Sequence, residues 1–194
     1  IEDSLPVFRR YFRAKASLLG KPKLAWWDLF APVGTSSTTY SYREACALVI
    51  ESFATFSERL ATFARRCFDE GWVDAEPRFG KRGGAFCMDL AGVKESRILM
   101  NFDGSLEQTS TLAHELGHAF HNECHYGAGM RPLQASTPMT LAETASIMCE
   151  KILMDHIIEG GLDEEEELAV LETELIGDSQ VIVDIYSRFL FETE

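Results

Sequence analysis

The sequence predicts a mainly α-helical chain of the α+β class with one small β-sheet. Most of its 194 residues lie in stretches whose apolar side chains recur at helical spacing. Only two short stretches, 85–90 and 97–102, have the composition of strands. Helical and strand patterns do not alternate along the chain, which argues against a doubly wound parallel fold.

The N-terminal part of the chain is expected to form three helices. The first covers residues 1–19 and ends at Gly20. A turn-rich connection at 31–39 leads to the second helix, which opens at Ser41 with a Ser-x-x-Glu capping-box pattern. Ser57 is the expected N-cap of the third helix.

The middle of the chain is expected to contain the sheet and two long helices. Residues 74–84 are polar and glycine-rich, and the two strands follow them. The link 91–96 is short enough for a hairpin, although the sequence alone does not fix the pairing. The long helices are predicted over 106–124 and 141–158.

A last helix is predicted to begin at Asp163 and to bend near Gly177. The chain starts at Ile1 rather than Met and stops inside a helical pattern, so we expect it to be a piece of a longer protein. Its length favours one domain over 1–194. Within that domain we distinguish three parts: a helical part over 1–71, a part with the sheet and the two long helices over 72–160, and a C-terminal helix over 161–194.

Composition and charge argue against several classes of protein and partner. There are 31 acidic and 18 basic residues, a net charge of −13, which disfavours nucleic acid or an anionic membrane as a partner. The longest uncharged apolar runs fall far short of the roughly 20 residues that a membrane span needs. The five cysteines are odd in number and show no CxxC spacing. Together with the lack of a signal peptide, they lead us to expect reduced thiols and a cytoplasmic location.

The segment His114-Glu115-x-x-His118 carries the clearest chemical signal. On a helix, positions i and i+4 share one face, so both imidazoles can reach one metal ion. Glu115 is offset by about 100° around the helix, where it is poorly placed as a third ligand. It is well placed to take a proton from a metal-bound water, which is why this motif needs both residue types.

A catalytic zinc site needs a third protein ligand. The candidates are His121, Cys124, His125 and Glu143. Gly and His at the positions of His121 and Cys124 would complete the longer pattern HExxHxxGxxH, and this sequence lacks them. His125 would lie about two turns from His118 and therefore too far from the same ion.

Glu143 and Glu150 each have two interpretations from the residues alone. Glu143 can reach the metal if the second long helix folds back against the first, but Thr140-x-x-Glu143 is also a capping-box pattern. Glu150 lies seven residues later on the same helical face. It can accept a hydrogen bond from a ligating imidazole or form a surface ion pair.

Several stretches together resemble the oligoendopeptidase F branch of the thimet oligopeptidase-like zinc metallopeptidases. They are Leu112-Ala-His-Glu-Leu-Gly-His-Ala-Phe-His121, Leu141-Ala-Glu-Thr-Ala-Ser146, Trp72-Val-Asp-Ala-Glu-Pro-Arg78, Gly80-Lys-Arg-Gly-Gly-Ala-Phe-Cys87 and Ile98-Leu-Met-Asn-Phe102. The resemblance covers the chain from about residue 40 to its end. It implies a zincin-like helical catalytic domain with a small sheet beside the HExxH helix, of which this chain would be a part.

The resemblance also implies functional roles for these residues. His114, His118 and Glu143 would bind one Zn²⁺ ion, and Glu115 would act as the catalytic base. The implied substrates are short peptides. Members of this family are longer and supply a His and one or more Tyr that are thought to stabilise the oxyanion, and nothing in this chain clearly matches those residues.

The resemblance further implies that an edge strand of the small sheet pairs with an extended peptide substrate. We place this strand at Gly84–Cys87, with Gly84, Ala85 and Phe86 as the binding residues, because glycines permit a close backbone approach. The competing interpretation is that Gly83 and Gly84 simply form a turn.

A non-catalytic helical binding module, with a structural metal or none, is the main alternative function. A structural zinc site is usually closed by a fourth protein ligand, and Cys124 is the nearest candidate. The glutamate beside His114 argues against this alternative, because a structural site needs no base. A zinc hydrolase that acts on another amide is a third interpretation, which HExxH alone does not exclude.

Overall fold

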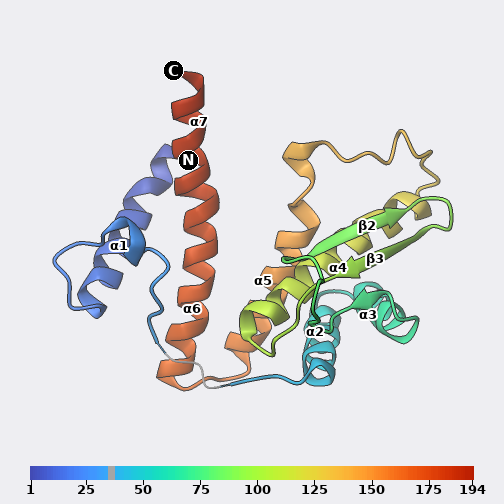
Figure 1. Cartoon of the computed structure of the whole chain (residues 1–194), viewed down its shortest axis with the longest axis horizontal. Coiled ribbons are helices and arrows are strands. Elements are labelled where there is room, and N and C mark those ends of the chain that lie inside the picture. Colours follow the sequence, from blue (N-terminus) through green and yellow to red (C-terminus); the bar gives the residue numbers. More distant parts are fainter. Residues whose placement is uncertain (35–37) are drawn as a thin grey trace. The chain divides into compact units, whose positions relative to one another are not determined.

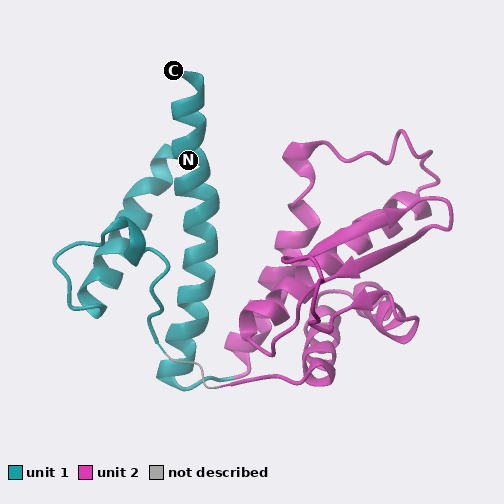
Figure 2. Cartoon of the chain, in the orientation of Figure 1, with its two compact units in different colours: residues 1–37, 161–194 teal, residues 38–160 magenta. Residues whose placement is uncertain are grey.

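The computed structural model describes residues 1–34 and 38–194, which form two compact units (Figures 1 and 2). The first unit comprises residues 1–37 and 161–194, and the second comprises residues 38–160. Part of the predicted connection at 31–39 lies outside the described residues. None of the helices in the described part of the chain combines the length and apolarity needed to cross a membrane.

The first unit combines the N-terminal and C-terminal segments of the sequence, and its described residues contain helices and connecting turns but no strand. Its elements are the 3₁₀ turns η1 (Glu2–Ser4) and η2 (Trp26–Asp28), the helices α1 (Leu5–Leu18), α6 (Glu164–Ser179) and α7 (Ile185–Thr193), and the π-helical turn η4 (Gln180–Asp184). The buried Lys15 of α1 forms an ion pair with the buried Glu172 of α6. The predicted cap Asp163 is confirmed, since its carboxylate accepts hydrogen bonds from the backbone N–H groups of Glu165 and Glu166.

The second unit contains the sheet and the predicted metal-binding segments. Its helices are α2 (Tyr42–Phe56), α3 (Glu58–Asp69), α4 (Leu106–Gly127) and α5 (Thr144–Glu159), with a 3₁₀ turn η3 (Met139–Leu141). Its strands are β1 (Val73–Asp74), β2 (Phe86–Leu90) and β3 (Glu95–Leu99). The capping box at Ser41 is confirmed: the Ser41 hydroxyl accepts a hydrogen bond from the Glu44 N–H, and the Glu44 carboxylate accepts one from the Ser41 N–H.

The sheet has the strand order β1-β3-β2, so β2 is an edge strand. β2 and β3 form an antiparallel hairpin in which Phe86 pairs with Leu99, while β1 pairs with β3 in parallel. Helix α4 contacts both β2 and β3 as well as α5 (Figure 1). The core of the unit is apolar and includes the fully buried Val49, Phe53, Leu60, Leu112, Leu116 and Leu153.

Several details differ from the sequence prediction, among them the second predicted strand, which was placed at 97–102 and lies at Glu95–Leu99. The prediction missed β1, because a two-residue strand leaves no alternating pattern. Helix α5 begins at Thr144 rather than at residue 141, because the preceding turn is 3₁₀. Residues 38–71 belong to the unit that carries the sheet, whereas residues 1–37 belong with 161–194. The prediction of a single domain over 1–194 stays a prediction.

Candidate metal centre

Helix α4 brings the two predicted histidine ligands together. His114 and His118 are one turn apart, and their rings meet edge to face with centroids 4.8 Å apart. The two Nε2 atoms are 3.2 Å from each other. Ser105 caps the start of this helix by accepting a hydrogen bond from the Gln108 N–H. The local helical spacing is therefore sufficient to aim both imidazoles at one point.

Glu143 is the residue that precedes α5, and its carboxylate reaches the same point. Its Oε2 atom is 3.2 Å from Nε2 of His114 and 3.2 Å from Nε2 of His118. The Ser146 hydroxyl donates to that Oε2 atom at 2.7 Å and also to the Glu143 carbonyl at 3.0 Å. Within the described chain the Glu143 side chain makes no helix-capping bond, so its carboxylate points to the histidines rather than to the backbone.

The approach of α5 to α4 depends on the glycine inside the motif. A Cβ atom at Gly117 would lie 2.6 Å from the Ala145 carbonyl oxygen and 2.6 Å from the Ser146 Cα. Both are backbone atoms of α5 and could not move aside alone. Gly117 therefore allows the helix pair to pack closely enough for Glu143 to reach the imidazoles.

The three donor atoms have the spacing of a tetrahedral zinc site. Bond lengths of about 2.0–2.1 Å to a tetrahedral ion place neighbouring ligand atoms about 3.3 Å apart. The three observed distances of 3.2 Å agree with this value. A group of two imidazoles and one carboxylate is also a ligand set that zinc accepts.

Glu150 contacts the other ring nitrogen of His114. Its Oε1 atom meets Nδ1 of His114, which leaves Nε2 of the same ring directed at Glu143 and His118. Burial is the largest single influence and would lower the pKa of His114, but the hydrogen bond and charge of Glu150, together with the charges of Glu115 and Glu143, raise the net pKa. At His118 burial prevails and lowers the pKa.

Glu115 is buried beside the three donor residues. It is 5% exposed, and its Oε2 atom has no hydrogen-bond partner among the described residues. Burial is the main reason that the pKa of Glu115 rises to about 7. Burying an ionised carboxylate without partners costs free energy of folding, unless a ligand or a substrate group supplies the missing contacts.

The three donor residues and Glu115 line an open cleft of about 420 Å³, which the edge strand β2 also borders. Of the three predicted substrate-binding residues, Ala85 and Phe86 line the cleft. Gly84 precedes them, and its carbonyl accepts a hydrogen bond from the Asn101 side chain. The other lining residues are Cys87, Asp89, His114, Glu115, His118, His121, Asn122, Thr137, Ala142 and Glu143.

Asp89 is a lining residue that the sequence analysis missed. It follows Ala85 and Cys87 at a spacing of two, so the alternation of a strand places all three on one face. Extending the predicted edge-strand segment by this period would have included it. Its carboxylate also contacts the hydroxyl of Tyr126 on α4.

The remaining candidates for a third ligand do not join the group. His121 lines the cleft, but its ring packs at a tilt against that of His125, with ring centroids 4.5 Å apart. Cys124 lies beside Arg59, whose guanidinium is 3.8 Å from its sulfur. Among the described residues, only His114, His118 and Glu143 form a group with the spacing of metal ligands. The described part of the chain therefore offers no fourth protein ligand that would close a structural zinc site.

The comparison with protein families agrees with this arrangement. The profile of Peptidase family M3 matches residues 2–180, so the chain belongs to that family. Oligoendopeptidase F of Lactococcus lactis subsp. cremoris is 30% identical over 88% of this chain and 28% of its own length. Oligopeptidase PepF of Bacillus subtilis is 28% identical over 91% of this chain and 26% of its own length. The resemblance to the oligoendopeptidase F branch is thus confirmed, and the chain spans less than a third of these relatives.

Solved structures confirm the mainly helical fold. A crystal structure from Chlamydophila abortus, assigned as a peptidase, has a TM-score of 0.83 at 25% identity over 97% of this chain and 32% of its own. A Bacillus anthracis structure, assigned as an oligoendopeptidase F, has a TM-score of 0.71 at 21% identity. It covers 88% of this chain and 32% of its own, and its likeness concerns the fold alone.

Proposed function

We propose that this chain forms the zinc-binding part of an endopeptidase that hydrolyses short peptides. The observation that carries the proposal is the set of three 3.2 Å distances among His114, His118 and Glu143, with the Glu115 carboxylate beside them. These three side chains would hold the ion. When bound, zinc would lower the pKa of a water molecule and polarise the scissile carbonyl.

Glu115 is the base in this proposal. Its buried carboxylate accepts a proton as water attacks the scissile carbonyl, and it then delivers that proton to the leaving amine nitrogen. The role is supported by the Oε2 atom of Glu115, which has no hydrogen-bond partner among the described residues, so no other side chain competes for that oxygen. Glu150 holds His114 in the orientation that directs Nε2 to the metal.

The edge strand β2 supports peptides as the substrate class. An edge strand presents unpaired backbone groups, which can pair with any extended peptide regardless of its side chains. Ala85 and Phe86 begin this edge within the cleft that holds the metal ligands. The names of the relatives, oligoendopeptidase and oligopeptidase, agree with short peptides as substrates.

Two substitutions test the proposal by separating metal binding from proton transfer. In Glu115→Gln, we expect bound zinc to remain and cleavage of an internally quenched peptide to fall about 100-fold to 10,000-fold, because the base is lost. In Glu143→Ala, we expect zinc itself to be lost. Zinc is measured by atomic absorption, and cleavage by fluorescence.

Glu107→Gln is the matched control, since Glu107 is exposed in the first turn of the same helix. It should bind zinc and cleave the peptide as the unmodified protein does. Unchanged turnover in Glu115→Gln would refute the role of the base. Full zinc occupancy in Glu143→Ala would refute the ligand set.

A further inference from the structure

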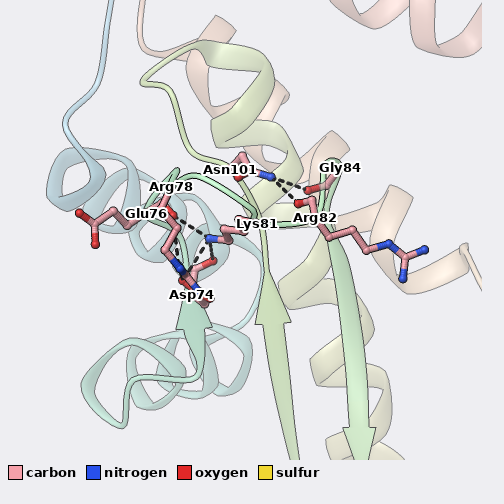
Figure 3. A network of polar contacts seen from close by, with 7 residues as sticks. All are labelled: Asp74, Glu76, Arg78, Lys81, Arg82, Gly84 and Asn101. Carbon is pink, nitrogen blue, oxygen red and sulfur yellow. Dashed lines mark hydrogen bonds and ion pairs between the residues drawn. The ribbon is translucent and has the colours of Figure 1, made fainter.

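Asn101 connects the end of one strand to the start of the edge strand that borders the cleft. It follows β3 by two residues, and its side-chain Nδ2 donates to the Arg82 carbonyl at 2.9 Å and to the Gly84 carbonyl at 3.3 Å. Figure 3 shows the amide directed at both oxygens, while the Arg82 side chain extends away from them. Asn101 therefore holds the backbone of the loop rather than its side chains.

The regular ladder between β2 and β3 cannot continue at this position. Phe86 pairs with Leu99, so the same register would place Gly84 opposite Asn101. Gly84 has φ of +78°, a left-handed conformation that takes the chain out of the strand. The Asn101 amide supplies a hydrogen bond to the Gly84 carbonyl at the point where the backbone ladder stops.

Lys81 anchors the other end of the same loop. Its ammonium group donates to the Asp74 carbonyl at 2.9 Å, to the Glu76 carbonyl at 2.9 Å and to the Asp74 carboxylate at 3.0 Å (Figure 3). The Lys81 side chain is only 1% exposed, so these oxygens compensate the burial of its charge. Arg78 also donates from its two terminal guanidinium nitrogens, Nη1 and Nη2, to the two Asp74 carboxylate oxygens, each at 2.7 Å.

The two anchors fix where the chain enters the cleft. Lys81 holds the loop to the end of β1, and Asn101 holds it to the segment after β3. Ala85, the first lining residue of the edge, directly follows the Gly84 carbonyl that Asn101 binds. The position and direction of the free edge at Ala85–Cys87 therefore depend on the Asn101 amide.

We propose that Asn101 is a positioning residue for peptide substrates. It does not contact the substrate. Through the Arg82 and Gly84 carbonyls it sets the alignment of the edge strand against which an extended peptide pairs. This inference rests on the proposed peptidase function and adds the residue that aligns the substrate-binding edge.

Asn101→Asp tests the role, because it preserves the shape of the side chain and replaces the donating NH₂ with an acceptor. Misalignment should weaken the pairing between peptide and edge strand, and a loss of one to two hydrogen bonds corresponds to a rise in KM on the order of tenfold. We expect kcat to stay within about twofold and zinc content to be unchanged, since α4 and α5 carry the ligands. Asn101→Ala repeats the test without the added charge, in case the aspartate variant does not fold.

Glu95→Gln is the matched control on the same sheet. Glu95 pairs with Arg97 at the opposite end of the β2–β3 hairpin, so its loss should leave KM unchanged. An unchanged KM in a folded, zinc-loaded Asn101 variant would overturn the proposal. A fall in kcat with the same KM would also overturn it.

A second measurement separates this inference from the proposed function. Binding of the same peptide to the metal-free protein, followed by fluorescence anisotropy, should weaken about tenfold in Asn101→Asp. If the zinc-loaded unmodified protein binds the peptide without cleaving it, the peptidase proposal fails, while binding to the metal-free protein still measures the positioning role. Equal binding by both proteins would overturn the positioning role alone.

Discussion

His114 uses its two ring nitrogens for different contacts, and this division is the main residue-scale feature of the site. Nδ1 contacts Glu150, while Nε2 faces Glu143 and His118. A carboxylate at Nδ1 fixes the tautomer and increases the basicity of the ligating nitrogen. Glu150 therefore belongs to the candidate metal centre even though its own oxygens are not part of the group of three donor atoms.

We expect Glu150→Gln to lower zinc affinity about 10-fold to 100-fold, the usual cost of losing such a partner. Cleavage at saturating zinc should fall much less than in Glu115→Gln. Zinc affinity is measured by competition with a chelating indicator. Glu159→Gln, at the exposed end of the same helix, is the control and should bind zinc normally. Equal affinities in the Glu150 and Glu159 variants would contradict the role of Glu150.

The sequence predicted some of these residues and not others, according to how local their contacts are. The HExxH spacing alone places His114 and His118 together, because both belong to one helix. Glu143 joins them from the residue just before α5, and its capping-box pattern left two interpretations until the family resemblance favoured one. Asn101 was missed because its partners, Arg82 and Gly84, become neighbours only through the sheet and a left-handed glycine.

At the scale of elements, the close packing of α4 against α5 creates the candidate metal centre. The contact occurs at Gly117, where no side chain separates the helix from the Ala145 carbonyl. The sequence predicted both helices because each has strong apolar periodicity. It did not show that the glycine between the two histidines is the point of contact, since inter-helix distance leaves no periodic signal.

We expect Gly117→Ala to weaken zinc binding more than tenfold, because the added methyl would displace the backbone of α5 and with it Glu143. Overpacking of this kind should also cost about 1–3 kcal/mol of stability. Isothermal titration with zinc and thermal unfolding measure the two effects.

Gly127→Ala provides the control in the same helix. An added Cβ there would meet only the Arg59 guanidinium, at an ordinary 3.7 Å. This variant should bind zinc normally and gain a little stability from the better helix propensity of alanine. Normal zinc affinity in Gly117→Ala would show that the helix pair tolerates a wider separation.

At the scale of the whole molecule, each unit relies on contacts that sequence patterns do not report. In the first unit, Lys15 and Glu172 are 157 residues apart and yet form a buried ion pair. Their helices were each predicted from periodicity, but no local signal connects them. Residues 1–37 likewise belong to one compact unit with residues 161–194, because long-range partners determine which helices pack together.

The second unit should depend on metal for part of its stability. The three donor residues come from α4 and from the start of α5, so a bound ion would connect two segments that are distant in sequence. Because the unfolded chain has no such preformed group, zinc binding adds to the free energy of unfolding. At a zinc concentration about 1,000-fold above Kd the gain is about 4 kcal/mol, which corresponds to a rise in Tm on the order of 10 °C.

A chelator should therefore lower the Tm of the zinc-loaded protein by about that amount, as measured by differential scanning calorimetry. Hydrogen exchange should increase most in α4 and α5, where the ligands lie. Glu143→Ala lacks one ligand, so its Tm should be low from the start and should not respond to the chelator. An equal Tm for the unmodified protein with and without chelator would show that the three donors do not bind an ion in the folded chain.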